Sequence, residues 1–222
     1  MATKVNPVTG ALDYYEQALP PFRNKIYNGG MQIAQRGDVT GITSTTYGGP
    51  DRFQSILGTA GTWSLSKSTD APSGSGFSNS FKIDCTTANS SLSSGSLYLF
   101  GQKLEGQNVQ DLAYGTSSAK NVTLSFWVKS SVAQNFYGRL ETPDGTSQNY
   151  PFETGSLSAD TWTKITKTIS GDSNITFNND NGLGLQFDFF AFLGTGSTGT
   201  MTLNQWGNYC LLYTSPSPRD RG

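Results

Sequence analysis

The chain has no histidine among its 222 residues. Imidazole is the usual base beside a nucleophilic serine or cysteine and a frequent zinc ligand. Its absence therefore excludes Ser-His-Asp and Cys-His catalysis and every zinc site built on histidine. Nothing else in the sequence indicates a metal or a cofactor, so we expect neither.

Charge and long apolar runs are also scarce. Charged residues make up 14% of the chain and the net charge is -1. Phosphate backbones are bound by clusters of Lys and Arg, so we expect no nucleic-acid partner. No apolar run approaches the roughly 18 residues of a membrane helix, and no basic start followed by an apolar stretch opens the chain. We therefore expect no membrane insertion and no signal peptide.

The sequence contains only two cysteines, Cys85 and Cys210. Cys85 shares one strand face with Phe81 and Ile83, while Lys82 and Asp84 take the other, and it is expected to be a small core residue. Cys210 begins the tail CLLYTSPSPRDRG, which could be a disordered Ser/Pro linker or a phosphorylated segment. The tail more closely resembles the conceptual translation of a sequencing adapter. We therefore expect residues 210–222 to be extraneous and the real open reading frame to stop near Tyr209, truncated within the domain. Cys85 would then be the only authentic cysteine, and no disulfide would form.

Glycine is abundant, with 26 residues, and Ser, Thr and Asn are frequent, as in proteins made of strands and turns. After a short helix expected at Glu105–Leu112, the apolar period changes to two. Val122, Leu124, Phe126 and Val128 then share one face, which predicts a half-buried strand.

Further strands are predicted along the rest of the chain. They include Met31–Gln35, a central strand at Leu97–Phe100, a hairpin around Thr142–Gly145, Trp162–Ile169 and Leu183–Leu193. Roughly nine strands separated by turns predict an all-β fold, an antiparallel β-sandwich with one short helix. We expect residues 24–209 to form this domain and residues 1–23 to form an N-terminal arm.

Five segments together resemble the C-terminal domain of a phage tail-fibre family. They are NGGMQIAQRG, GGPDRF, KLEGQNVQDLAYGTSSAKNVTLSFWVKSS, DTWTKITKTISGD and DNGLGLQFDF. The resemblance runs from about Asn24 to Tyr209 and implies a jelly-roll of the carbohydrate-binding-module type. The arm is similar to the attachment region found upstream in such proteins. Members usually continue past the segment matching Trp206–Tyr209, so a closing strand is expected to be missing and to leave an unpaired strand edge.

The same resemblance implies a virion structural protein at the phage tail, made in the host cytoplasm. Such a protein would be a homotrimer that binds a host surface glycan and other tail proteins. Two alternatives remain open: a carbohydrate-binding module detached from an enzyme, and a surface-polysaccharide hydrolase.

Sugars are bound by aromatic faces and planar polar side chains, so residues of these kinds on outward faces are the candidates for a sugar site. Tyr137 and Arg139 are expected to point outward from one strand, with Asn149 across the hairpin from Arg139. An ordinary solvated strand face with one charge pair is the competing interpretation. Trp127 lies on the polar face of its strand and is a second candidate platform, with burial under a loop as the alternative.

Paired carboxylates would indicate glycoside hydrolysis. Six acidic residues are available, but no spacing among them singles out a pair; they are Glu105, Asp111, Glu141, Asp144, Glu153 and Asp188. We therefore expect no catalytic residue and a protein that is not an enzyme.

Overall fold

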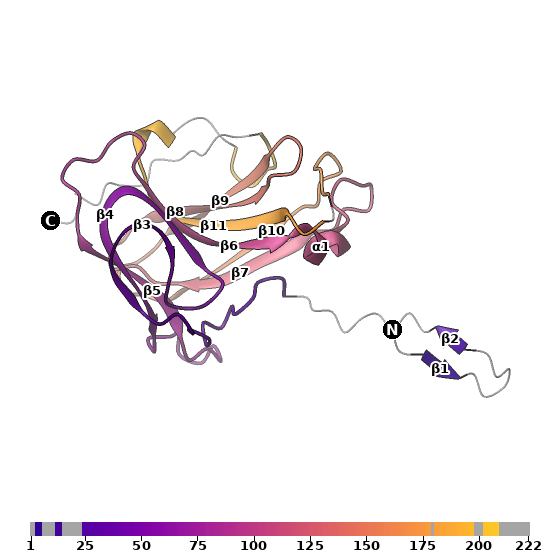
Figure 1. Cartoon of the computed structure of the whole chain (residues 1–222), viewed down its shortest axis with the longest axis horizontal. Helices are drawn as coiled ribbons and strands as arrows, with labels where there is room; N and C mark the ends of the chain where they lie inside the picture. Colours follow the sequence, from indigo (N-terminus) through magenta and orange to yellow (C-terminus); the bar gives the residue numbers. More distant parts are fainter. Residues whose placement is uncertain (1–2, 6–11, 15–23, 179, 198–201, 209–222) are drawn as a thin grey trace.

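A computed structural model describes residues 3–5, 12–14, 24–178, 180–197 and 202–208 (Figure 1). The strands are β1 (Thr3–Val5), β2 (Leu12–Tyr14), β3 (Val39–Tyr47), β4 (Gln54–Ser68), β5 (Ser80–Thr87), β6 (Leu97–Glu105), β7 (Val122–Val128), β8 (Asn135–Thr142), β9 (Gln148–Ser156), β10 (Thr163–Ile169) and β11 (Leu183–Leu193). One α-helix, α1 (Gly106–Val109), and two 3-10 turns, η1 (Gln110–Leu112) and η2 (Thr195–Ser197), complete the fold. The predicted all-β antiparallel sandwich with one short helix is confirmed.

Strand β4 bends in its middle, and this bend folds the large sheet over so that its two ends face each other as a sandwich. The large sheet has the order β3-β4-β6-β11-β8-β9, and β5 joins it by pairing with β4. The first part of β4 pairs with β6 and the second part with β5. Between the two parts, Thr59 and Gly61 have positive φ angles of 50° and 100°. This bend brings β5 over β6, so that the Phe81 and Phe100 rings meet edge to face at 5.5 Å.

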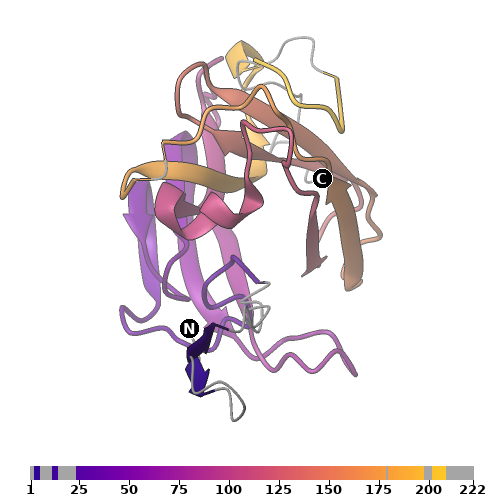
Figure 2. The ribbon, with the colours of Figure 1, turned by 90° about the vertical axis from the view of Figure 1, so that its right-hand side faces the viewer.

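The sandwich consequently has two unequal layers (Figure 2). We call the first part of β4 with β6, β11, β8 and β9 the closed layer, because its strands pair without interruption. The split layer faces it in two parts, the second half of β4 with β5 and the start of β3, and the separate β7–β10 pair. The end of β3 stays paired with the first part of β4, at the edge of the closed layer. Phe126 of β7 reaches the closed layer, with ring centroids 6.2 Å from Phe152 and 5.8 Å from Phe189.

The alternation predicted for β7 is confirmed by the packing. Val122, Leu124 and Phe126 contact the core, whereas Thr123 and Ser125 are exposed. The bounds of β11 match the predicted strand, and β6 is a central strand between β4 and β11. The hairpin is also confirmed, since β8 ends at Thr142 and β9 begins at Gln148.

The helix predicted at Glu105–Leu112 is present as the single turn α1 followed directly by the 3-10 turn η1, while Glu105 is the last residue of β6. Val109 and Leu112 are buried, as their spacing on one helical side requires. Ala113 takes a left-handed conformation that ends the last turn. Gly115 follows with φ +81°, where an added Cβ would lie 2.3 Å from the Ile175 carbonyl oxygen. The chain therefore turns sharply from the helix into the loop that leads to β7.

Two parts of the N-terminal half differ from the prediction. The strand expected at Met31–Gln35 is wrong, because residues 31–34 form no strand and follow a turn at residues 27–30. The Asn28 side chain bonds the backbone of Gln32 and Ile33 and so occupies the groups that a strand partner would need. Strand β3 was not predicted, since it is rich in Ser and Thr and mostly exposed. In the arm, β1 and β2 pair with each other. The expected extraneous tail, 210–222, lies outside the described residues.

Candidate functional site

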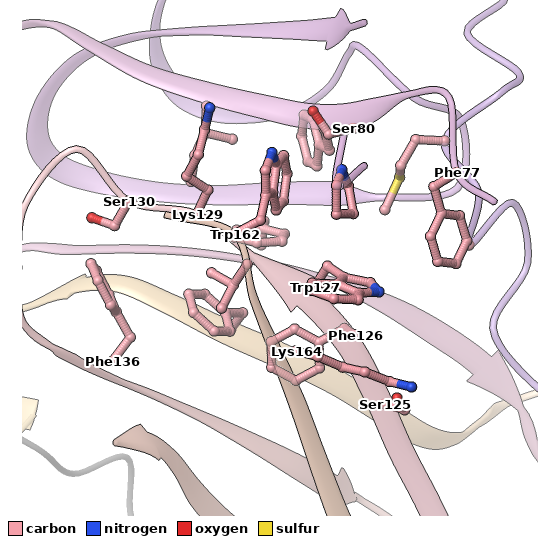
Figure 3. A pocket seen from close by; sticks show the side chains of 18 of the residues that line it. Phe77, Ser80, Ser125, Phe126, Trp127, Lys129, Ser130, Phe136, Trp162 and Lys164 are labelled. Carbon is pink, nitrogen blue, oxygen red and sulfur yellow. The ribbon is translucent and has the colours of Figure 1, made fainter. Parts of the chain in front are cut away.

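A groove of about 1230 Å³ lies between the two parts of the split layer. Phe100, Phe187 and Phe189 of the closed layer form its floor. Its sides carry Phe81 from β5 and Phe126 from β7. The groove is therefore apolar inside, and its polar groups lie at its mouth (Figure 3).

Two tryptophans and two lysines alternate on the outer face of β7–β10, at the mouth of the groove. Trp127 of β7 lies opposite Lys164 of β10 in the strand register. Two residues further along, the Lys129 ammonium lies 5.4 Å from the centroid of the Trp162 ring. Residues directly opposite on one face of a sheet contact each other, so the four side chains form one surface. We call these four residues the Trp-Lys strip.

Asp70 fixes one end of the Trp-Lys strip. The Trp162 indole donates a hydrogen bond of 3.0 Å to one Asp70 carboxylate oxygen, and Lys129 forms an ion pair with the other. The Lys129 hydrogen bond, followed by that of Trp162, lowers the pKa of Asp70 below its usual 3.8. Asp70 therefore stays ionised at neutral pH and holds the Trp162 ring and the Lys129 ammonium in place.

Hydroxyl groups continue the strip along the same face. The Ser125 and Thr166 hydroxyls lie 3.4 Å apart across the two strands, and both residues are exposed. Among the described residues Lys164 has no carboxylate within ion-pair distance. The surface thus offers indole rings, hydroxyls and an available ammonium, which suits an extended ligand that carries both apolar and hydroxylated faces.

Of the predicted site residues, Trp127 lies on this surface, half-buried beside the groove. Tyr137, Arg139 and Asn149 lie elsewhere, on the face of the closed layer that points away from the split layer. Tyr137 is partly buried and accepts a hydrogen bond of 3.0 Å from the Asn135 amide. The sequence therefore indicated two separate surfaces.

Arg139 belongs to a buried network and does not present the exposed side chain that we expected. Its Nε donates to Asp188 at 2.8 Å, one terminal nitrogen donates to Asn149 at 2.9 Å, and the other lies 2.6 Å from Glu141. Arg139 is 9% exposed and Asn149 is 3% exposed. Asn149 faces Glu141 in the register and reaches Arg139 diagonally. With its donors engaged by these side chains, the guanidinium has a structural role.

The sequence analysis missed Trp162, Lys164, Lys129 and Asp70. The alternation in β7 and β10 was visible, and it placed Trp127 and Lys129 on one face. The register between these strands was not visible, because 34 residues separate Val128 from Thr163 and pairing across such a distance depends on the whole fold. Asp70 comes from a loop, for which periodicity gives no orientation.

No group of three residues able to bind a metal ion occurs in the part of the chain that the structure describes. In the same part, no helix has the length and apolar character needed to cross a bilayer.

Comparison with protein families and with curated proteins gives no match. One solved structure is similar, the enzymatically active domain of bacteriophage CBA120 tailspike protein 4. It is 14% identical with a TM-score of 0.40, and the match covers 77% of this chain and 20% of the tailspike chain. The similarity is compatible with a phage tail protein, and a likeness this distant supports no further argument.

The same comparison corrects one expectation. We expected a protein that is not an enzyme, but the similar structure is that of an enzymatically active domain. The expectation is contradicted and we do not retain it. The carboxylates that we considered for catalysis include Asp188 and Glu141, which the structure places in the Arg139 network.

Proposed function

We propose that this protein is a phage tail component whose sandwich binds a host surface glycan along the Trp-Lys strip. The sequence resemblance supports the tail assignment. The observation that carries the binding assignment is the alternation of Trp127 and Trp162 with Lys164 and Lys129 on one half-exposed face. This surface replaces the Tyr137 and Arg139 face as the site that we favour.

The chemistry of the strip fits a polysaccharide better than a small apolar ligand. An indole face packs against the apolar edge of a sugar ring, and neighbouring hydroxyl and ammonium groups bond its hydroxyls. Lys164 can in addition pair with the carboxylate of an acidic sugar. The strip follows the strand direction, so it suits a chain of sugars that lies along β7.

An open strip of this kind gives weak binding, because its hydrogen bonds compete with water. Several copies held together would convert later contacts into intramolecular ones and raise avidity by about 10² to 10⁴. A trimeric tail protein, as the resemblance implies, would supply these copies. Strong adhesion would then require the assembly.

The decisive experiment removes the Trp127 ring, one of the two indole surfaces of the Trp-Lys strip, and leaves the fold intact. Trp127→Ala should weaken binding to an array of bacterial surface polysaccharides by about tenfold, the loss expected for about 1.4 kcal/mol of ring contact. Tyr47→Ala is the matched control, since Tyr47 is a 40% exposed aromatic on β3 and does not line the groove. Circular dichroism should show both variants folded. Unchanged binding by Trp127→Ala, or an equal loss with Tyr47→Ala, would reject the strip as the site.

A further inference from the structure

A second hollow, of about 560 Å³, lies at the rim of the sandwich and shares no lining residue with the groove. A volume of this size is typical of small-molecule sites. The hollow is lined by residues between Gln35 and Arg52, by the end of β6 and by the start of β11. Gln54 of β4 faces Gly101 of β6, so Arg52 and Lys103 come together where β4 begins and β6 ends. We call this hollow the rim pocket.

Three cationic side chains line the rim pocket, and their donors have no acceptor. In the part of the chain that the structure describes, no carboxylate lies within ion-pair distance of Arg36, Arg52 or Lys103. No hydrogen bond engages their side-chain nitrogens in that part either. Arg139 shows the opposite arrangement, with a partner at each of its three nitrogens. The rim pocket therefore presents positive charge and forked donors that an anion can occupy.

Tyrosine rings position both guanidinium groups of the rim pocket. Arg36 lies 5.3 Å from the centroid of the Tyr47 ring, and Arg52 lies 4.8 Å from that of Tyr27. A ring face attracts a cation without accepting its N–H groups in the plane of the guanidinium, so these donors stay available. Arg52 also has a φ of 77°, which is uncommon for a residue with a side chain. The loop therefore holds this guanidinium at the pocket before a ligand binds.

Two carboxylates and one side-chain amide also line the rim pocket. Asp51 accepts a hydrogen bond of 3.1 Å from the Gln35 N–H, and Glu105 accepts hydrogen bonds from two side-chain amides of the turn that follows it. Each carboxylate keeps further lone pairs, and the Asn181 amide can both donate and accept. These groups pair with hydroxyls. A ligand that suits the whole pocket therefore carries one anionic group and several hydroxyls.

We propose that the rim pocket binds an acidic sugar, a uronic acid unit. The planar carboxylate of the sugar pairs with Arg36 and Arg52, and Lys103 adds positive charge beside them. The ring hydroxyls donate to Asp51 and Glu105. A bare phosphate would suit the cations, but it has no hydroxyl groups to match the two carboxylates. No residue of the Trp-Lys strip lines the rim pocket, so this inference does not depend on the strip.

Titration of the 222-residue chain with glucuronate, glucose and inorganic phosphate, followed by NMR chemical shifts, tests the proposal. Glucuronate should bind at least about tenfold more tightly than glucose or phosphate. Arg36→Gln and Arg52→Gln should each weaken glucuronate binding by about tenfold, because each removes charge-assisted hydrogen bonds. Lys82→Gln is the matched control, since it removes one exposed positive charge that pairs with Asp84 outside the pocket. Tyr47→Ala keeps all three cations and should weaken binding by less than about twofold.

Four results would overturn the proposal. Glucuronate that binds no better than glucose would show that the cations do not hold its carboxylate, and phosphate that binds as tightly would assign the pocket to small anions in general. An equal loss with Lys82→Gln would show an effect of net charge alone. Chemical shifts confined to β7 and β10 would place the acid on the Trp-Lys strip. Circular dichroism checks the fold of each variant; if one arginine variant does not fold, the other decides.

Discussion

The closed and split layers use the same apolar alternation and reach different degrees of burial. In β11 of the closed layer, Phe189 is 6% exposed and even Asp188 on the other face is fully buried. In β7 of the split layer, the equally regular Leu124 and Phe126 are only partly buried. The difference lies in the neighbours, because among the described residues β11 is paired on both edges and β7 on one. The burial of a strand is thus decided by the strands beside and above it.

The two layers also contain similar ion pairs in different surroundings. Asp188 and Arg139 pair in the closed layer, where both are buried. Asp70 and Lys129 pair at the edge of the split layer, where Asp70 is exposed. A buried pair is costly to break because the remaining charge has lost its water, whereas an exposed partner is resolvated. Breaking the Asp188–Arg139 pair of the closed layer should therefore lower the free energy of unfolding strongly. Breaking the Asp70–Lys129 pair of the split layer should lower it only slightly.

The largest difference should come from removing one ring in each layer. Phe152→Ala deletes a fully buried ring of the closed layer and should lower the free energy of unfolding by about 3 to 5 kcal/mol. Phe126→Ala deletes a ring beside the groove and should lower it by about 1 to 2 kcal/mol, because less surface is buried. Urea denaturation followed by circular dichroism measures both values.

Ser125→Ala is the control for Phe126→Ala, because Ser125 lies on the same strand, β7, and is exposed. It should lower the free energy of unfolding by less than about 0.5 kcal/mol. Equal losses for Phe152→Ala and Phe126→Ala would show that the two layers are equally covered. In that case the groove would not be an uncovered part of the core.

The second effect tests the buried ion pair. Asp188→Ala leaves the Arg139 guanidinium buried with Glu141 as its remaining carboxylate, and should cost about 3 kcal/mol in urea denaturation. Asp84→Ala is the control, since Asp84 pairs with Lys82 where both side chains are about half exposed. A loss below about 1 kcal/mol for Asp188→Ala would mean that the network contributes little to the fold.

Much of the fold followed from local patterns in the sequence. The strands β7 and β11 were predicted because apolar and polar residues alternate from Val122 to Phe126 and from Leu185 to Phe189. The helix was predicted from Val109 and Leu112. Strand β3 was not predicted, because apolar residues alternate in a strand only when one of its faces is buried, and β3 is mostly exposed. The bend in β4 could not be seen in the sequence either, since it depends on two residues with positive φ angles, Thr59 and Gly61, within a long strand.

The site was less predictable than the fold. Trp127 could be selected because an aromatic residue on a polar strand face is unusual. Arg139 was selected by the same reasoning, but it lies in a buried network. Alternation shows which face of a strand a residue takes, and it does not show what covers that face. The partners of Trp127 come from β10 and from the loop containing Asp70, so only the assembled sheet shows them together.

The smallest expected effect is the acid response of the Trp-Lys strip. The Lys129 and Trp162 hydrogen bonds lower the pKa of Asp70 in the folded protein below 3.8. Their contribution to stability is therefore complete above pH 3.8 and is lost as the pH falls through the lower folded value. Because Asp70 is exposed, we expect a loss below about 1 kcal/mol. The Trp162 ring should nevertheless lose its hydrogen bond, so tryptophan fluorescence should change below pH 3.8. Asp70→Asn should remove this change and Asp84→Asn should retain it; a transition that persists in Asp70→Asn would show that another group controls the strip.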